Sequence, residues 1–282
     1  DEFEYDKKLN ILNASGNVKI NDTVKKSIIY TNEITYLKNT EIIFTQGDSK
    51  ALEDGLTIYA DNFRYNKILE IINADGNVKI DNPIEDYVIY SENITYFKSK
   101  NKFLTQGKTK SVIEKKYNFY SSDVQFLRDK KILSSTKDVL TIVTDDDQKL
   151  YKFKEFEYFI DEDLLKANNL EIISENFLQN GFSDSAKFSR GFFKLKSKDY
   201  IAEETKFRLK KDTAGNFEND PRLDGVSSFR KNDLLTVNKG VFTSCNQSTD
   251  CPAWAIKAKT IKHDQKKRQL IYDDAILKIY NM

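Results

Sequence analysis

The stretch "LNASGNVKIND" (Leu12–Asp22) returns sixty residues later as "INADGNVKIDN" (Ile72–Asn82). The echo is longer than the phrase, because Ile11–Gly47 aligns with Ile71–Gly107 without a gap and with 17 of 37 positions identical. So much identity at a fixed distance indicates an internal structural repeat. Each copy is then expected to form one unit that stacks on the next.

A shorter period of about 30 residues lies inside this repeat. The first four members of one aromatic column are each followed, eleven residues later, by a glycine, and a second aromatic column precedes the first. The pattern fades after Lys137, although Leu150–Ile173 keeps its outline. The three columns are Tyr5, Tyr36, Tyr65, Tyr96 and Phe126; Gly16, Gly47, Gly76 and Gly107; and Tyr30, Tyr59, Tyr90 and Tyr120.

The repeated unit has the pattern of β-strands. From Ile72 to Ile80, apolar residues or glycine alternate with polar residues, which is the period of a half-buried strand. Turn-forming residues separate such runs near Asn21 and Asp81. Because a glycine recurs at one fixed position within a strand, we expect a bulge, a sharp twist or a close backbone approach there. The sequence therefore predicts an almost wholly β fold of antiparallel strands stacked along one axis, with strand also favoured over helix for Asp161–Ile173.

Successive units differ in what they would place on the inner face. After the first and third glycines these positions hold large apolar residues, and after the second and fourth they hold small or polar ones. We interpret this alternation as the mark of a two-walled structure whose units contribute differently to its walls. The two sets are Val18, Ile20, Val78 and Ile80, and Ser49, Ala51, Thr109 and Ser111.

The composition is that of a soluble chain with a balanced charge. The 282 residues include 45 basic and 44 acidic residues, and a net charge of +1 gives no general attraction to nucleic acid or to an anionic membrane. No apolar run reaches the roughly 18 residues of a membrane-spanning helix. Since the first residues are charged, we expect no signal peptide here and interpret the chain as a mature or excised soluble fragment.

A stack of this kind has one continuous inner face, which is either a filled core or an open, apolar trough that holds an acyl chain or peptide. Periodicity does not decide between the two. The tyrosines suit the rim of a trough, because the ring is apolar and the hydroxyl is polar. The residues predicted to line this face are Leu12, Ala14, Val18, Ile20, Ile28, Tyr30, Ile34, Tyr36, Ile43, Ile72, Ala74, Val78, Ile80, Tyr90, Ile94 and Tyr96.

Two parts of the sequence resemble a known family. The phrases "ASGNVKI" and "ADGNVKI", each followed by "IY" and then "ITY", resemble the OstA-like repeats of the lipopolysaccharide-transport proteins. Gly240–Met282, with "FTSC", "WAIKA", "IKHD" and "YDDAILKIY", resembles the segment that closes the periplasmic domain of the LptD outer-membrane proteins. The resemblance divides the chain into a repeat domain at 1–239 and closing strands at 240–282, leading into a β-barrel that this chain does not include.

The resemblance implies a V-shaped antiparallel β-jellyroll with an apolar inner groove. Such a domain receives lipopolysaccharide from an LptA-like bridge protein and guides the lipid A acyl chains toward the outer-membrane barrel. The implied location is the periplasmic face of the Gram-negative outer membrane. The implied contact with the bridge protein is edge-strand addition within Asp1–Ile34, and LptE would bind through the absent barrel. No nucleic-acid partner is implied.

Two cysteines close to the C-terminus leave the disulfide pattern open. Cys245 and Cys251 either bridge each other or, as the resemblance implies, Cys245 pairs with a cysteine of the barrel. His263 is the only histidine, and we expect it to be a turn or packing residue; Trp254 is expected to pack in the closing strand. Asp145–Asp147 has the character of a solvated turn, and we expect no metal site and no cofactor.

Nothing in the sequence favours an enzyme. The acidic residues lie on the solvent-exposed faces of the predicted strands, and no two of them stand out as a pair of catalytic carboxylates. The sequence contains neither a phosphate-binding glycine loop nor the Gly-x-Ser-x-Gly motif of a nucleophilic serine. Besides the lipid relay, two alternatives stay open. One is a soluble LptA-like periplasmic carrier, and the other is a structural β-solenoid or adhesin whose filled core binds no ligand.

Overall fold

A computed structural model of the chain describes residues 2–23, 27–136, 140–144, 149–173, 185–209, 220–245, 253–264, 266–267 and 269–280. The chain forms two compact units, Asp1–Ser135 and Thr136–Met282. Both consist of antiparallel strands, so the predicted all-β antiparallel fold is confirmed. The predicted boundary after residue 239 falls within a strand, Leu234–Thr243, and stays a prediction.

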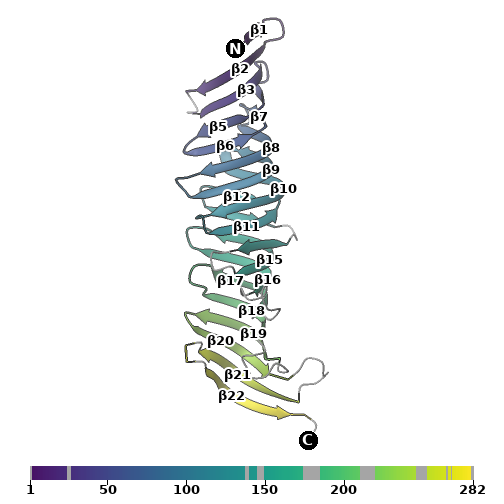
Figure 1. Cartoon of the computed structure of the whole chain (residues 1–282), viewed down its shortest axis with the longest axis vertical. Helices are drawn as coiled ribbons and strands as arrows, with labels where there is room; N and C mark the ends of the chain where they lie inside the picture. Colours follow the sequence, from purple (N-terminus) through teal and green to yellow (C-terminus); the bar gives the residue numbers. More distant parts are fainter. Residues whose placement is uncertain are drawn as a thin grey trace. The chain divides into compact units, whose positions relative to one another are not determined.

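The strands of the first unit follow one another along the stack in the order of the sequence (Figure 1). A single 3-10 turn, η1 (Lys98–Lys100), is the one helical element among its described residues. The strands are β1 (Glu2–Asp6), β2 (Ile11–Asp22), β3 (Ser27–Leu37), β4 (Ile42–Gln46), β5 (Ser49–Glu53), β6 (Leu56–Ala60), β7 (Asn62–Asn66), β8 (Ile71–Asn82), β9 (Tyr87–Phe97), β10 (Lys102–Ile113), β11 (Tyr117–Ser122), β12 (Gln125–Leu127) and β13 (Ile132–Ser135).

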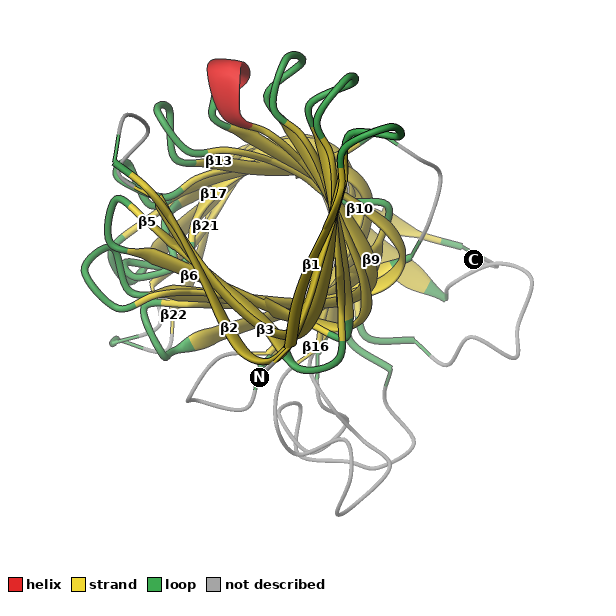
Figure 2. Cartoon of the chain, turned by 90° about the horizontal axis from the view of Figure 1, so that it is seen from above, coloured by secondary structure: helices red, strands yellow, loops and turns green. Residues whose placement is uncertain are grey.

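Strand pairing divides this unit into two walls. The long strands β2, β3, β8, β9 and β10 belong to both, while each short strand belongs to one. The first wall consists of residues 18–22, 27–31, 49–53, 56–60, 78–82, 87–91, 109–113 and 117–122. The second wall consists of residues 2–6, 11–15, 33–37, 42–46, 62–66, 71–75, 93–97, 102–106, 125–127 and 132–135. The two-walled interpretation of the repeat is thus confirmed by the strand pairing. Figure 2 looks along the stack, so that the strands of the first unit, such as β1, β5 and β6, are seen edge-on.

The walls meet at a corner where the pairing register shifts. The shifts lie between Ser15 and Val18 in β2, between Asp75 and Val78 in β8, and between Gln106 and Thr109 in β10. A bulge of this kind adds residues to one strand and bends it. Gly16, Gly76 and Gly107 lie within these shifts, so the predicted bend at the recurring glycine is confirmed.

Backbone hydrogen bonds hold the corner together along the stack. Asn32 donates its N–H to the carbonyl of Gly47, Gly47 to that of Asp61, and Asp61 to that of Gly76, at 3.2, 3.0 and 2.9 Å. Gly47 and Gly76 have φ of +79° and +78°, a conformation that residues with a Cβ rarely adopt. The corner therefore needs glycine or a short polar residue where the chain passes between walls.

Two of the four small inner residues, Ser49 and Thr109, have a role at the same corner. Ser49 and Thr109 are buried, and their hydroxyls satisfy polar groups there: Ser49 contacts Thr45 at 2.6 Å, and Thr109 donates to Thr105 at 2.7 Å. Thr45 in turn accepts the backbone N–H of Phe63 at 2.8 Å. Buried polar groups need such partners, and small hydroxyl residues supply them in every second unit.

The second unit is a consecutive antiparallel run of strands. Asp161–Ile173 contains β16 and no helix, which confirms the prediction of strand for this segment. Its core is aromatic, with Phe153 packed on Phe156 and Phe188 packed on Phe193. The strands are β14 (Thr141–Thr144), β15 (Leu150–Phe159), β16 (Leu164–Ile173), β17 (Ser185–Lys194), β18 (Tyr200–Arg208), β19 (Arg222–Lys231), β20 (Leu234–Thr243), β21 (Trp254–Asp264) and β22 (Gln269–Ile279).

Two alanine substitutions separate backbone strain from steric conflict at the corner. Gly76 and Gly107 share a φ of +78°, but a Cβ at Gly76 would lie 2.2 Å from Oδ2 of Asp61, whereas a Cβ at Gly107 meets nothing within 4 Å. We expect Gly107→Ala to cost about 1 kcal/mol from backbone strain and Gly76→Ala to cost about 2–3 kcal/mol. Urea unfolding measures both. Equal losses would contradict the close approach of Asp61.

Candidate functional site

The inner face of the first unit opens into a cavity at its N-terminal end. The cavity has a volume of about 430 Å³ and lies between the edge of the first wall, in β2, and the edge of the second wall, in β1. Seven of the residues predicted for the inner face line it, and so do several polar residues at its rim. The seven are Leu12, Ala14, Val18, Ile20, Ile34, Tyr36 and Ile43.

Further along the stack the same face is filled. Six other predicted residues point inward and are at most 4% exposed: Ile72, Ala74, Val78, Ile80, Ile94 and Tyr96. Tyr96 stacks on Phe103 with ring centres 4.3 Å apart, and Phe126 packs edge-on against Tyr87 at 4.7 Å. The inner face of the first unit is therefore an open trough at its N-terminal end and a filled core beyond it.

Three predicted inner residues are placed on the outer face, and here the prediction of orientation was wrong. Ile28, Tyr30 and Tyr90 precede the corner, whereas Ile34 and Ile94 follow it. In β3 and β9 the corner shifts the alternation by one position, so an even-numbered residue before it points outward and an even-numbered residue after it points inward. Tyr30 and Tyr90 are accordingly 39% and 41% exposed.

A tyrosine, a carboxylate and a lysine form a polar group beside the cavity. Burial, together with a hydrogen bond to Glu41 and its negative charge, raises the pKa of Tyr36 to about 12. The bonds from Tyr36 and Lys67 hold the pKa of Glu41 below its ordinary value. The Lys67 ammonium lies 3.1 Å from Glu41 and above the Tyr36 ring, 5.7 Å from its centre. Glu41 and Lys67 were not predicted as site residues, because they lie in turns and turn residues carry no strand periodicity.

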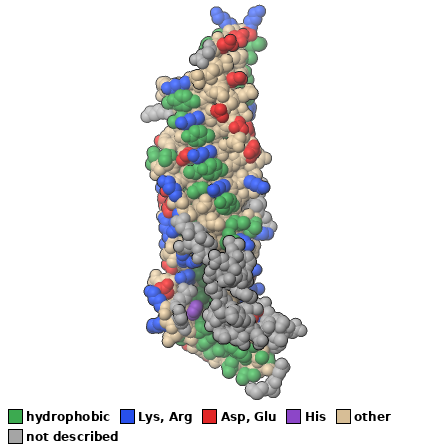
Figure 3. All heavy atoms as spheres, in the orientation of Figure 1, with side chains coloured by type: hydrophobic (Ala, Val, Ile, Leu, Met, Phe, Trp, Pro, Cys, Tyr) green, Lys and Arg blue, Asp and Glu red, His purple; other side chains and the backbone are tan. Residues whose placement is uncertain are grey.

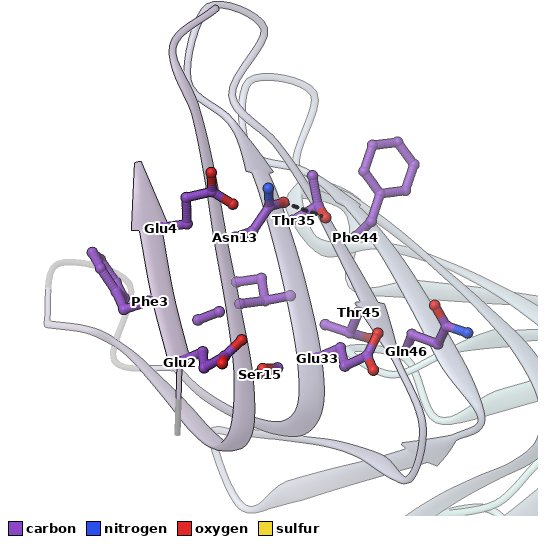
Figure 4. Close-up of a pocket in the computed structure, with 12 residues that line it drawn as sticks. Glu2, Phe3, Glu4, Asn13, Ser15, Glu33, Thr35, Phe44, Thr45 and Gln46 are labelled. Carbon is purple, nitrogen blue, oxygen red and sulfur yellow. Dashed lines mark hydrogen bonds between the residues drawn. The ribbon is translucent and has the colours of Figure 1, made fainter. Parts of the chain in front are cut away.

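The other side of β1–β4 is polar and carries acidic residues. Glu2, Ser15, Glu33 and Gln46 form one cross-strand row, and Glu4, Asn13, Thr35 and Phe44 form the next, as Figure 4 shows. Thr35 donates a hydrogen bond to Asn13 at 2.9 Å, and the hollow over these rows measures about 350 Å³. The end of the unit is therefore apolar inside and polar outside.

The first strand of the first unit, β1, and the last strand of the second unit, β22, are each hydrogen-bonded to a neighbouring strand along one edge only among the described residues. β1 pairs with β2, and its five residues are all exposed. β22 pairs with β21, and Ile271, Ile276 and Leu277 are each about half or more exposed. Among the described residues no second strand pairs with either, so their outer edges keep backbone groups available for strand addition.

The predicted disulfide is not confirmed. Cys245 has a free, half-buried thiol whose Sγ lies 3.7 Å from the carbonyl oxygen of Trp254, and Cys251 lies outside the described residues. Burial raises the pKa of this thiol, but hydrogen bonds with Thr243 and with the backbone of residues 253 and 254 outweigh burial and lower it. Trp254 packs on Phe242 at 6.0 Å, as expected for the closing strand, where His263 also lies. Asp145–Asp147 fall outside the described residues.

No helix within the described residues is long and apolar enough to cross a membrane. Nor do these residues contain a group of three or more His, Cys, Asp or Glu side chains placed to hold a metal ion.

Comparison with solved structures gives distant neighbours, two of which are described here. No family model and no curated protein matches the sequence. Among solved structures, the chain is similar to LptH of Pseudomonas aeruginosa, described as the LptA homologous periplasmic component of the lipopolysaccharide transport device. The identity is 14%, the TM-score 0.38, and the match covers 42% of this chain and 87% of LptH. The WD40 domain of SCAP from fission yeast matches at 6% identity and a TM-score of 0.15, over 100% of this chain and 87% of that domain. Neither likeness identifies a ligand for this chain.

The polar group beside the cavity can be tested by titration. In Glu41→Gln the negative charge next to Tyr36 is lost, so we expect the pKa of Tyr36 to fall from about 12 toward its ordinary value. Carbon-13 NMR of ring-labelled tyrosine measures this pKa, with Tyr36→Phe to assign the signal. Glu92→Gln, a distant exposed carboxylate in β9, is the control and should leave it unchanged. An unchanged pKa in Glu41→Gln would contradict the contact.

Proposed function

We propose that this chain is a periplasmic relay domain for lipopolysaccharide, of the kind found in LptD proteins. The observation that carries the proposal is the cavity of about 430 Å³ at the N-terminal end of an otherwise filled apolar face. The "GNVKI" phrases on β2 and β8 and the C-terminal tail, which resemble this family, support it. The proposal involves no catalytic step.

The cavity suits one end of an amphiphile with anionic groups. Acyl chains would contact Leu12, Ile20 and Ile34, and each buried methylene contributes about 0.8 kcal/mol. Lys19 and Lys67 line the same cavity and would face phosphate groups at its rim. Lys67 would exchange its bond to Glu41 for the phosphate, which makes that ion pair a reversible contact.

Passage beyond the cavity would require the walls to separate. The interior at Val78 and Ile80 is closed in this structure, with exposures of 1% and 0%. In a relay, acyl chains would displace the contacts between the walls and replace them with equivalent apolar ones. The filled interior is also the observation that favours the second candidate, a structural β-solenoid with no ligand. A soluble carrier would use the cavity alone.

The exposed strand edges suit the proposed partners. An LptA-like bridge protein would add a strand to β1, so that the inner faces of the two proteins continue each other. In the second unit, β22 would lead into the outer-membrane barrel that holds LptE. The apolar side chains Ile276, Leu277 and Ile279 on β22 are exposed and suit such a continuation.

Photo-crosslinking in Gram-negative cells tests the relay. A photoreactive residue at Ile34, in the cavity, and one at Val78, in the closed interior, should both capture lipopolysaccharide. The same residue at Arg64, on the exposed outer face of β7, is the matched control and should capture at least about tenfold less. Adducts at Ile34 without adducts at Val78 would favour a carrier over a relay. The absence of adducts at both would favour the filled solenoid.

The bridge contact has its own test. A photoreactive residue at Phe3 in β1 should yield an adduct with an LptA-like protein, because strand addition at β1 brings that protein within contact distance. Leu69, in the turn between β7 and β8, has similar exposure, 61% against 72% for Phe3, and serves as the control. Equal adducts at the two positions would contradict edge-strand addition at β1.

A further inference from the structure

A ladder of alternating lysine and tyrosine runs along the outer face of the first wall. Each member is the cross-strand partner of the next, over eight successive strand segments from β2 to β11. The members, in order along the stack, are Lys19, Tyr30, Lys50, Tyr59, Lys79, Tyr90, Lys110 and Tyr120. We call these eight residues the Lys–Tyr ladder. Figure 3 shows basic and hydrophobic side chains alternating down this part of the molecule.

The ladder is stiffened by contacts between its own members. Lys50 and Lys79 lie on opposite strands beside Tyr59, with ammonium groups 5.4 and 5.6 Å from the ring centre. Lys19 lies over the ring of Tyr30 and Lys110 over the ring of Tyr120, each at 5.6 Å. Cation–π contacts attract an ammonium group to the face of a ring, so they favour these lysine positions in the unbound protein.

Most of the positive charge on the ladder is uncompensated. Lys79 pairs with Asp81 at 2.6 Å, whereas within the described residues Lys19, Lys50 and Lys110 have no carboxylate partner. Asp81 is also the one acidic member of the cross-strand row beside the ladder. That row consists of Asn21, Ile28, Leu52, Thr57, Asp81, Val88, Val112 and Asn118. On the other side of the ladder, toward the corner, Asp48, Asp61 and Glu92 lie two positions from Lys50, Tyr59 and Tyr90. The ladder is therefore a basic line whose acidic neighbours lie mainly at the corner.

The spacing of the ladder sets the shape of a partner. Neighbouring strands lie about 4.8 Å apart, so successive lysines are about 9.6 Å apart and the ladder is about 34 Å long. The tyrosine hydroxyls, which both donate and accept hydrogen bonds, lie between the charges. A matching partner is a thin, extended chain with one negative charge in every two units and hydroxyl groups between them.

We propose that the Lys–Tyr ladder binds an acidic polysaccharide lying along the outer wall. An extended sugar chain has a unit length comparable to the strand spacing and supplies both the acid groups and the hydroxyls. A membrane surface fits less well, because Tyr59 lies between two lysines and the ladder tyrosines are only 37–43% exposed, which leaves no apolar ring free to insert. Lys19 also lines the inner cavity, whereas the other seven members of the ladder do not line it.

The experiment uses hyaluronate oligosaccharides, which carry one carboxylate per disaccharide, and the whole chain. Binding is measured by calorimetry at low and at physiological salt, with neutral dextran as the uncharged probe. In the double variant Lys50→Gln/Lys110→Gln we expect affinity for hyaluronate to fall at least about fivefold, since two unpaired charges are removed. The matched control Lys100→Gln/Lys130→Gln removes two exposed lysines outside the ladder and should change the affinity less than about twofold.

Three other results would contradict the proposal. Equal losses in the two double variants would show an effect of net charge alone. No binding of hyaluronate, or equal binding of dextran, would exclude recognition of an acidic sugar chain. Ladder-dependent binding of phosphatidylglycerol vesicles or of single-stranded DNA, with none of hyaluronate, would assign the ladder to another class of partner. Unchanged thermal unfolding midpoints establish that both variants are folded.

Discussion

The structure of the first unit depends on the corner where the chain passes from one wall to the other. At each passage a backbone N–H donates to a carbonyl of the next unit, from Asn32 to Gly47, from Gly47 to Asp61 and from Asp61 to Gly76. The extra residue lies in β2, β8 and β10, and the inward residues of these strands keep one parity along the whole strand, as Ala74 and Val78 do in β8. In β3 and β9 the parity of the inward residues changes at the corner, as it does between Ile29 and Ile34 in β3.

The strands, the bend at the recurring glycine and the alternation of large with small inner residues were predictable, because each recurs in the sequence at a fixed period. The orientation of residues before the corner was not predictable in the same way. Nothing between Tyr90 and Ile94 distinguishes a straight strand from a bent one, and simple alternation assigns both to the same face. The aromatic column from Tyr30 to Tyr120 was visible, but the lysine opposite each tyrosine emerges only from the pairing of strands.

The candidate site was predictable in its apolar part and not in its polar part. Leu12, Val18 and Ile34 follow the strand period, so the sequence places them on the inner face. That this face is open at one end follows from where the walls begin, in β2 for one and in β1 for the other, which is a property of pairing. Lys67 and Glu41 come together beside Tyr36 from separate turns, and local sequence carries no signal of such a contact.

The same corner thus separates two surfaces with different chemistry, an apolar interior and a basic, aromatic outer wall. Thiol labelling of two cysteine variants, Tyr90→Cys and Ile94→Cys, tests this separation most directly when both native cysteines are replaced by serine. Tyr90 is 41% exposed and Ile94 is 3% exposed, although both have even numbers in one strand. We expect fast maleimide labelling at position 90 and slow labelling at position 94 in the folded protein. Equal rates at the two positions would contradict the shift of alternation at the corner.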